Sequence, residues 1–542
     1  MQALLKPLLE LAEYEDIVKK KKEAPGVLML TGCVNSQKTH MMYALSDGCC
    51  YKVIACSSEA KAKQIYEEYR FLDPNTYLYP AKDLLFYQAD LRSRELVQQR
   101  MEVIQSVITG QDITVVTSFD GFMDALLPKA EIERRTITVK GDSAVDLAKM
   151  QRELARLGYD REIQIEGPGQ FAVRGGILDV YPLTEELPIR IELWGDEVDS
   201  IRTFDVGTQR SIENLEEVVI YPASEFPEEG EKRVSFLDYF EPEHTILFLD
   251  EPVRLLEKGK GVEDEFIEAQ KRRLESGYDM TDAEAQLFHT DEIVKRMNGY
   301  SSIGFFALEM RCRGFEVRAS FSLMTKSVNP YNSSFDMLTQ DLKRLKRNGY
   351  RVVLLSGSRT RAKRLAEDLR DYNLSSYYSD EMDREVSPGE IMTAYGHVAE
   401  GYEYPMLKFT VIAETDIFGK VKKKKKRKSY EGRKIQSFSE LKPGDYVVHE
   451  NHGLGIYQGI EKIEVDKVAK DYMKISYAKG GNLYIPATQL DLIQKYASSD
   501  AKKPKLNRLG TQEWTKTKKK VRGAVKEIAK DLVELYAARQ ES

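Results

Sequence analysis

The sequence predicts an α/β multidomain protein whose first part contains a parallel sheet with helices on its faces. Short β-branched or aromatic runs alternate with helical stretches, a glycine-containing loop follows the first run, and 542 residues allow about three to five domains. Strands that alternate with helices at this spacing form parallel sheets. The predicted strands are Val27–Leu30, Val53–Ala55, Thr76–Tyr79 and Ile113–Val116, with helices at Glu59–Arg70 and Ser93–Ile108.

The loop after the first strand has the spacing of a phosphate-binding loop with one glycine replaced. Gly32, Lys38 and Thr39 fit the pattern G-x-x-x-x-G-K-[ST], but Gln37 stands where the second glycine belongs. A side chain there costs about 1–2 kcal/mol in a left-handed backbone and blocks the approach of the phosphates. We therefore expect a nucleotide-binding frame that binds no nucleotide. The alternative is an ordinary strand-turn-helix that shares the pattern by chance.

A second stretch also concerns whether the chain binds a nucleotide. Thr245–Glu251 is an apolar strand that ends in two acids, Asp250 and Glu251. In an ATPase such a strand end supplies the Asp that organises Mg²⁺ and the Glu that positions the attacking water. Pro252 follows directly, so the alternative is a strand that leads into a helix with Asp250 as its N-cap.

Composition and charge exclude several classes of protein. The formal net charge is −6, which argues against a chain committed as a whole to coating DNA. Five cysteines, an odd number with no pairing pattern, indicate reduced thiols in a cytoplasmic protein. The six histidines are not spaced with the cysteines as metal ligands, so we expect no metal site. No run of about 18 apolar residues predicts a membrane span.

The middle of the chain predicts an antiparallel insertion followed by a small α/β module. From Gly121 to Glu228 the pattern changes to period-two strands, including a hairpin in which Ile189–Leu193 turns at Gly195-Asp196 and returns through Val198–Phe204. The small α/β module combines a strand at Tyr350–Ser356, a helix at Thr360–Arg370 and a strand at Val411–Ala413.

A linker follows, because Lys422–Lys428 are seven consecutive basic residues without apolar periodicity. A block of like charges repels itself and stays solvated. It could contact nucleic-acid phosphates, or it could be a soluble tether between domains.

The last part predicts a small five-stranded barrel and then an amphipathic helix. An edge strand of such a barrel can pair with a strand of another protein. His449 and His452 lack a surrounding ligand set, and we interpret them as structural. The helix at Thr511–Gln540 needs a partner surface for its apolar stripe, so we expect the chain to be the front part of a longer protein. The barrel strands begin at Leu441–His449 and continue at Gly453–Gly459, Lys462–Val465, Tyr472–Tyr477 and Asn482–Ile485.

These residues carry a resemblance to a known family. Nearly the whole chain is similar to the N-terminal half of the bacterial transcription-repair coupling factors. The stretches that carry the similarity are the loop Gly32–Thr39, the segment Tyr79–Asp83, the run Gly169–Pro182 and the run Val447–Gly455. The second and third also resemble the excision-repair helicase UvrB, and the fourth resembles the CarD-type RNA polymerase interaction module.

The resemblance implies an adaptor in transcription-coupled DNA repair. A UvrB-like module would recruit UvrA, the barrel would bind the β subunit of RNA polymerase, and a motor using ATP and Mg²⁺ would lie beyond Ser542. UvrB keeps the glycine that Gln37 replaces and has an aromatic hairpin for which Lys82–Arg94 leaves no room, so we expect no cofactor and no catalysis here. The implied domains are a degenerate RecA-like domain at 1–120 and 229–325, an inserted α+β domain at 121–228, a small α/β domain at 326–418, a basic linker at 419–436, a Tudor/SH3-like barrel at 437–500 and a helical connector at 501–542.

The resemblance also implies particular contact residues. Arg161, Phe171 and Arg174 match positions of the insertion that contact UvrA. The alternative for Arg174 is pairing within its own sheet, and for Phe171 a place in the core. The residues implied for polymerase binding in the barrel are Ile463, Tyr472 and Ile475, each of which could instead be core.

Two rival hypotheses belong to other classes of function. One is a UvrB-type ATPase that uses Lys38, Thr39, Asp250 and Glu251 despite Gln37. The other is a DNA-binding regulator that acts through Lys422–Lys428 and the barrel.

Overall fold

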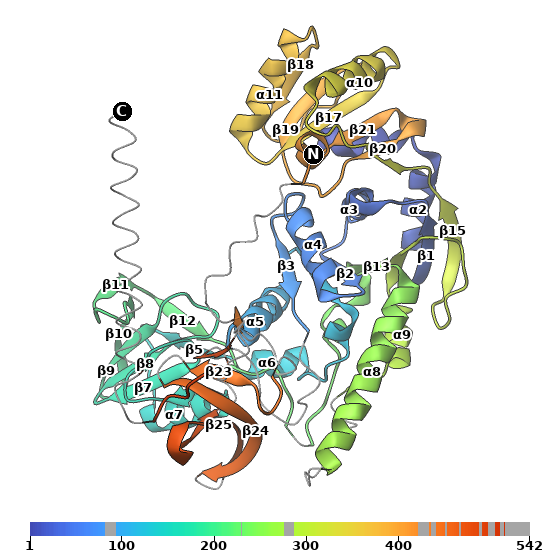
Figure 1. Cartoon of the computed structure of the whole chain (residues 1–542). Helices are drawn as coiled ribbons and strands as arrows, with labels where there is room; N and C mark the ends of the chain where they lie inside the picture. Colours follow the sequence, from blue (N-terminus) through green and yellow to red (C-terminus); the bar gives the residue numbers. More distant parts are fainter. Residues whose placement is uncertain are drawn as a thin grey trace. The chain divides into compact units, whose positions relative to one another are not determined.

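The computed structural model describes residues 1–81, 94–228, 230–275, 287–420, 433–434, 441–449, 452–465, 468–486, 490, 492–496, 504–509 and 514. It divides into two compact units: the first covers Met1–Lys82 and Gln99–Lys424, and the second contains the strands between Arg433 and Lys495 (Figure 1). The predicted linker Lys422–Lys428, residues 82–93 and residues 515–540 of the predicted C-terminal helix lie outside the described residues. No helix in the described ranges is long and apolar enough to span a membrane.

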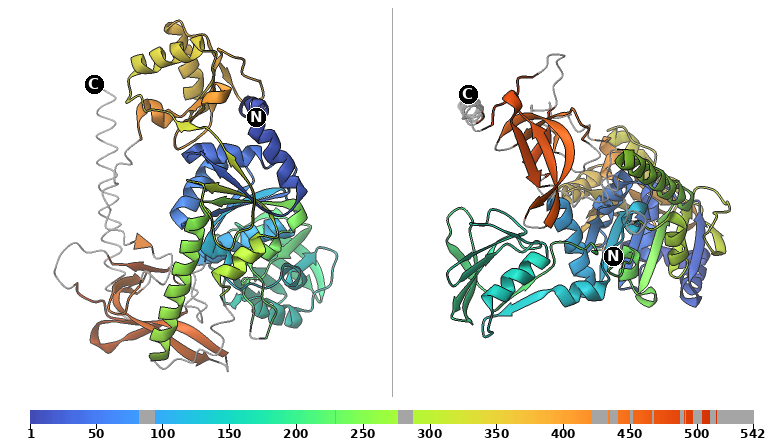
Figure 2. Two further views of the ribbon diagram at one scale, coloured as in Figure 1. Left: turned by 90° about the vertical axis from the view of Figure 1, so that its right-hand side faces the viewer. Right: turned by 90° about the horizontal axis from the view of Figure 1, so that it is seen from below.

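The first unit is built on a seven-stranded sheet in which every pair of neighbouring strands is parallel, as the sequence predicts. Its spatial order is β15 (Val317–Ser322), β1 (Gly26–Thr31), β14 (Ser301–Phe306), β13 (Thr245–Asp250), β2 (Tyr51–Cys56), β4 (Ile113–Ser118) and β3 (Thr76–Tyr79). Figure 2 shows the sheet from two further sides, with α8 as the long light-green helix. The helices of this domain are α2 (Ala12–Glu23), α3 (Asn35–Ala44), α4 (Glu59–Tyr69), α5 (Arg94–Ile108), α8 (Pro252–Glu275) and α9 (Thr290–Met297).

The insertion between β4 and β13 is mainly antiparallel, as predicted. The predicted hairpin is present, with Trp194 paired to Glu197 across its turn. Helix α7 (Leu147–Arg156) contributes Met150 and Leu154 to the core under one face of the sheet. That sheet has the order β11 (Ser211–Asn214), β10 (Glu197–Phe204), β9 (Ile189–Trp194), β8 (Ile177–Val180), β7 (Gln170–Arg174) and β6 (Asp160–Arg161), and α6 (Lys129–Arg135) precedes a separate pair of strands, β5 (Ile137–Lys140) and β12 (Glu217–Ile220).

One buried guanidinium holds both chain crossings of the insertion. Arg100 on α5 is fully buried and lies 2.8 Å from Asp124, which follows β4, and 2.9 Å from Glu225, which follows β12. Because Asp124 lies where the chain leaves the parallel sheet and Glu225 where it returns, Arg100 fixes the base of the insertion. Buried charges of this kind are retained only when they are paired.

A small α/β domain follows β15 and shares its core with the parallel-sheet domain. Buried residues of both domains, such as Met41 and Phe409, belong to one hydrophobic cluster, which also includes Leu4 of α1 (Gln2–Leu5). The small domain has helices α10 (Phe335–Arg347), α11 (Arg359–Asp371) and α12 (Glu414–Phe418) and a sheet of order β16 (Lys326–Ser327), β20 (Tyr402–Tyr404), β21 (Phe409–Ile412), β17 (Arg351–Ser356), β19 (Ile391–Tyr395) and β18 (Ser376–Ser379).

The second unit is an antiparallel β domain with its own core. The sequence predicts separate strands at Gly453–Gly459 and Lys462–Val465, and this is wrong: they form one continuous strand, β24 (Gly453–Val465). A bulge between Tyr457 and Gly459, where Gly459 has φ +109°, bends the strand without ending it. The described strands lie in the order β22 (Arg433–Lys434), β27 (Ile493–Lys495), β23 (Tyr446–His449), β24, β25 (Val468–Ser476) and β26 (Asn482–Pro486), and the predicted closure into a five-stranded barrel stays a prediction.

Candidate functional site: a closed phosphate loop and two interaction surfaces

Gln37, which replaces the expected glycine, is a buried structural residue. Its side-chain oxygen accepts a hydrogen bond from the Val34 backbone N–H at 3.2 Å, which caps the start of α3. Its amide nitrogen donates to the Tyr404 hydroxyl of β20 at 2.9 Å. Gln37 is 0% exposed, and its contact with Tyr404 is fully buried. One side chain therefore closes the loop and ties it to the small α/β domain.

The hydrogen bonds continue through His40 to the N-terminal helix. The Nε2–H of His40 donates to the Leu4 carbonyl at 2.8 Å, so the Nδ1 atom accepts from the Tyr404 hydroxyl at 2.7 Å. Burial lowers the pKa of His40 to about 4, and the hydrogen bond to Leu4 acts in the other direction. His40 is thus neutral at pH 7 and joins three segments that are distant in sequence.

The lysine and the hydroxyl of the loop are also engaged within the protein. Lys38 forms an ion pair with Asp250 at 2.9 Å, and Asp250 is 1% exposed at the end of β13. The Thr39 hydroxyl donates to Glu68, a buried residue of α4 that also accepts from Ser36 at 3.0 Å. Burial raises the pKa of Glu68, although the hydrogen bonds from Thr39 and Ser36 partly offset it. Groups that would hold phosphate and Mg²⁺ in an NTPase are therefore bound to carboxylates.

Gly32 packs closely against the backbone of Leu323. A Cβ atom at Gly32 would lie 1.8 Å from the carbonyl oxygen of Leu323, just after β15, and Gly32 has φ +83°. The Leu323 N–H donates to the Thr31 carbonyl at 2.9 Å. A second segment approaches Ser36, whose hydroxyl accepts from the Glu400 N–H at 3.1 Å. Backbone of this chain thus lies against both ends of the loop.

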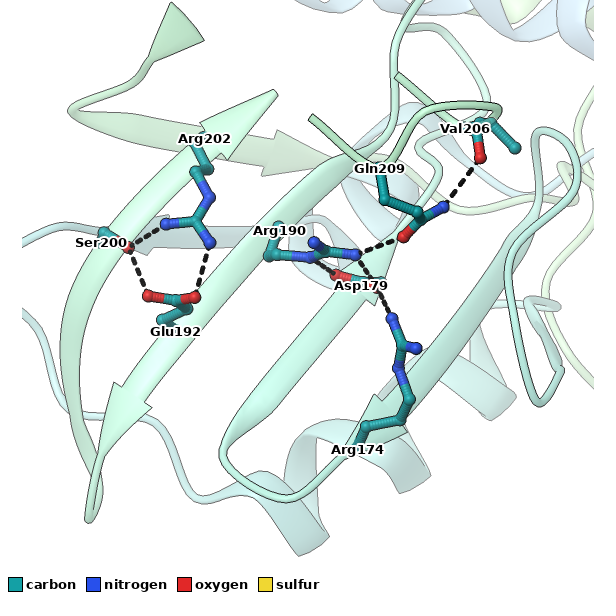
Figure 3. A network of polar contacts seen from close by, with 8 residues as sticks. All are labelled: Arg174, Asp179, Arg190, Glu192, Ser200, Arg202, Val206 and Gln209. Carbon is teal, nitrogen blue, oxygen red and sulfur yellow. Dashed lines mark hydrogen bonds and ion pairs between the residues drawn. The ribbon is translucent and has the colours of Figure 1, made fainter. Parts of the chain in front are cut away.

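The insertion presents a polar network on the face of its sheet opposite α7 (Figure 3). Arg190 of β9 makes two hydrogen bonds to Asp179 of β8, at 2.8 and 2.9 Å, and another to Gln209 at 2.8 Å. Arg174 of β7 reaches the same carboxylate at 3.4 Å. A neighbouring unit on this face pairs Arg202 with Glu192 at 2.5 Å. The network therefore places three arginines against two carboxylates.

The pleat of this sheet separates the residues predicted to contact UvrA. Ala172 and Arg174 lie on the outer face, because Ala172 is opposite Asp179, whereas Phe171 points to the α7 side and is 2% exposed in the core. Arg161 is paired with Phe171 and belongs to that side, although it is exposed at the sheet edge. Arg174, with half of its side chain exposed, is the candidate that lies on the outer face.

In the second unit, strand alternation likewise separates the three residues predicted to bind polymerase. Ile475 is 0% exposed and packs in the core of the β domain. Tyr472 is opposite Glu461, and Ile463 lies two residues further along β24, so both half-buried side chains share the outer face of the β24–β25 hairpin. The rings of His449 and His452 lie 4.8 Å apart, and His449 is buried. Within the described ranges no three His, Cys, Asp or Glu residues gather as metal ligands, and all five cysteines are free.

Comparison with known proteins matches both of these regions. A family model described as the UvrB interaction domain matches residues 137–226, and one described as the CarD-like/TRCF RID domain matches residues 441–497. The transcription-repair-coupling factor of Bacillus subtilis (strain 168) is 32% identical, covering 87% of this chain and 45% of that protein. The one from Staphylococcus aureus (strain MRSA252) is 29% identical, covering 86% and 44%.

Over most of its length the chain is similar to the transcription-repair-coupling factors. This confirms the resemblance inferred from the sequence, and the chain spans about half the length of the curated relatives that it matches. The two matched regions hold the outer face with Arg174 and the hairpin face with Tyr472. The phosphate loop, Gly32–Thr39, lies outside both matched regions.

Sequence reasoning missed the partners of Gln37 and the extent of the polar network. Tyr404 lies 367 residues from Gln37, so nothing local in the sequence points to it. The network has a local signal, because Arg190 and Glu192 alternate with buried Ile189 and Ile191 along a predicted strand. That alternation identifies which side chains share the outer face.

The buried state of His40 predicts a pH dependence of stability. Its pKa of about 4 in the folded protein is below the ordinary 6.5, so the unfolded chain binds more protons and stability is lost as the pH falls from 6.5 towards 4. Between pH 7 and pH 5 this costs about 2 kcal/mol. We expect His40→Gln, which cannot titrate, to lose that much less stability over this range in urea denaturation followed by circular dichroism.

The quantity to compare is the difference in unfolding free energy between the wild type and His40→Gln at each pH, because this difference cancels groups that titrate in both proteins. Glu68 and Asp416 have raised pKa values and act in the opposite direction, but both are present in each protein. The same pH dependence in wild type and variant would show that His40 is not held neutral by this contact.

Proposed function

We propose that this chain is an adaptor of transcription-coupled DNA repair that binds UvrA through its insertion and the β subunit of RNA polymerase through its β domain. The observation that carries the proposal is the presence of two interaction-domain matches in one chain, each over a separately folded core. The names of the relatives support the pairing of transcription with repair. The ATP-driven motor expected of such factors lies, in this proposal, in sequence outside this chain.

The outer face of the insertion supports binding to an acidic protein surface. Asp179 carries one negative charge but is approached by two guanidinium groups, and Arg190 holds it with two short hydrogen bonds. Arg174 is the weaker partner at 3.4 Å and is 51% exposed, so its charge is the one left for a partner. An arginine of this kind can form a bidentate pair with a carboxylate. Arg190 and Asp179 stay paired and keep the surface in shape.

The Arg174→Ala variant tests the UvrA surface. We expect calorimetric titration with purified UvrA to show binding that is weaker by about 2–5 kcal/mol in this variant, because a partner carboxylate would be left unpaired. Arg152→Ala is the matched control, since Arg152 is an exposed arginine on α7, on the other side of the same sheet. Equal losses in both variants would point to a general charge effect and count against this surface.

The hairpin face of the β domain supports a second, separate contact. Ile463 and Tyr472 form a half-exposed apolar pair beside the ion pair between Glu461 and Lys474, which is 3.2 Å long. Aromatic side chains with polar neighbours are typical of protein interfaces. On this basis Ile463 and Tyr472 contact polymerase, and Ile475 supports the sheet beneath them.

Alanine variants separate these two roles. We expect Tyr472→Ala to weaken capture of RNA polymerase about tenfold or more, as at an interface hot spot, while leaving the circular dichroism spectrum unchanged and lowering the thermal midpoint less than Ile475→Ala does. Ile475→Ala removes a buried side chain and should instead cost about 2–5 kcal/mol of stability. Lys479→Ala, in an exposed turn, is the control for binding. A Tyr472→Ala protein that binds polymerase normally would contradict the proposal that the β24–β25 hairpin contacts polymerase.

We further propose that the phosphate loop binds no nucleotide. Lys38, Thr39 and Gln37 each have a partner within the protein, and a nucleotide would have to displace all of them. DNA contact through Lys422–Lys428 stays a prediction for the same chain. Both rival functions can be tested directly on the purified protein.

Thermal denaturation with nucleotide tests the closed loop. Any ligand that binds the folded state alone raises the midpoint, by an amount equivalent to about 2.7 kcal/mol at a hundredfold excess over the dissociation constant. We expect millimolar ATP and Mg²⁺ to leave the midpoint unchanged. An increase that disappears in Lys38→Ala would revive the ATPase hypothesis.

A further inference from the structure

Trp194 is a large apolar side chain left in water at the end of β9. It is 83% exposed, although a tryptophan can bury roughly 150–250 Å² at a contact. Single exposed apolar residues are normal on protein surfaces, so exposure alone decides nothing. Trp194 differs from other exposed apolar residues because it lies on the insertion, beside the polar network.

Strand alternation puts Trp194 on the same face as the polar network. Along β9, Ile189 and Ile191 are core residues, and Arg190 and Glu192 lie on the outer face. Leu193 packs against the insertion core, so the next residue, Trp194, points outward with Arg190 and Glu192. The indole therefore continues the row of side chains that contains the arginine network.

A glycine turn brings the strand that carries Arg174 close to Trp194. The Leu193 N–H donates to the Gly176 carbonyl at 2.8 Å. A Cβ atom at Gly176 would lie 2.9 Å from the Leu193 carbonyl oxygen, so glycine permits this approach. Arg174 is opposite Ile177, which is opposite Glu192, so Arg174 and the β9 row are two strand spacings, about 10 Å, apart.

The charges around Trp194 favour one kind of partner. Glu192 is held by Arg202 at 2.5 Å and Asp179 by Arg190 at 2.8 Å, so both carboxylates of the network are neutralised. The outer face thus offers an exposed indole and an exposed guanidinium, the two side-chain types that carry most of the binding energy at protein interfaces. Glu197, which is exposed and lies opposite Trp194 in the hairpin, balances the charge of Arg174. The face therefore lacks the several positive charges that a nucleic-acid surface needs for its phosphate contacts.

We propose that Trp194 is the aromatic anchor of the surface that contains Arg174, and that it inserts into an apolar pocket of UvrA beside a carboxylate that pairs with Arg174. The proposal rests on the proposed function, because it takes UvrA as the occupant of this face. It adds the apolar half of a contact whose charged half is Arg174.

Affinity measurements test the anchor. By calorimetry with UvrA we expect Trp194→Ala to raise the Kd about 30-fold, as for an interface hot spot. Trp194→Phe should retain most of the affinity, because it keeps an aromatic ring. Leu308→Ala is the matched control: Leu308 is 73% exposed in the first unit but outside the insertion, and its loss should change nothing.

Fluorescence tests the same contact without deleting it. The chain has two tryptophans, so in a Trp514→Phe protein Trp194 is the sole tryptophan. We expect UvrA to shift its emission to the blue and to protect it from acrylamide quenching.

The outcomes separate this inference from the proposed function. If UvrA binds and Arg174→Ala weakens binding, but Trp194 stays fully quenchable and Trp194→Ala binds normally, the anchor is overturned and the UvrA surface stands. If the unaltered chain binds no UvrA in calorimetry, both are overturned.

Discussion

The buried hydrogen bond between Gln37 and Tyr404 is the contact on which the first unit depends. It lies where two α/β domains and the N-terminal helix share one hydrophobic cluster, and it gives the polar atoms at that junction their partners. A glycine at position 37 would leave the Val34 N–H and the Tyr404 hydroxyl without this partner. The Tyr404 hydroxyl would still donate to His40, so the loss is one hydrogen bond at each site, typically about 0.5–1.5 kcal/mol. The residue that breaks the nucleotide motif thus stabilises the domain junction.

The other residues of the motif also have partners within the protein. Lys38 and Asp250 neutralise each other next to the sheet, and Thr39 satisfies the buried Glu68 carboxylate. Each of these groups would be costly to bury alone. Packing and charge balance therefore give each of these residues a structural role in this chain.

Local sequence patterns made much of this protein predictable, and long-range contacts made the rest unpredictable. Short apolar runs between helices predicted the parallel sheet, and period-two alternation predicted the β9–β10 hairpin. Strand β14 was missed because Ser301, Ser302 and Gly304 dilute its apolar pattern. Phe171 and Arg174 are an odd number of residues apart on one strand, so the sequence already implied opposite faces. Tyr404 as the partner of Gln37 had no such signal, because contacts between distant segments depend on the assembled fold.

The two proposed surfaces differ in how they are prepared for binding, but each lies on its own folded core. On the insertion, Asp179 and Arg190 order the face before a partner arrives, so binding there immobilises few side chains. On the β domain, the proposed contact residues belong to a hairpin whose core residue Ile475 lies on the opposite face. Because both surfaces are in one chain, a partner bound at one surface is held near a different partner bound at the other, at a local concentration set by the chain between them. The proposed adaptor function depends on these two surfaces, and no catalytic step by the loop that contains Gln37 enters it.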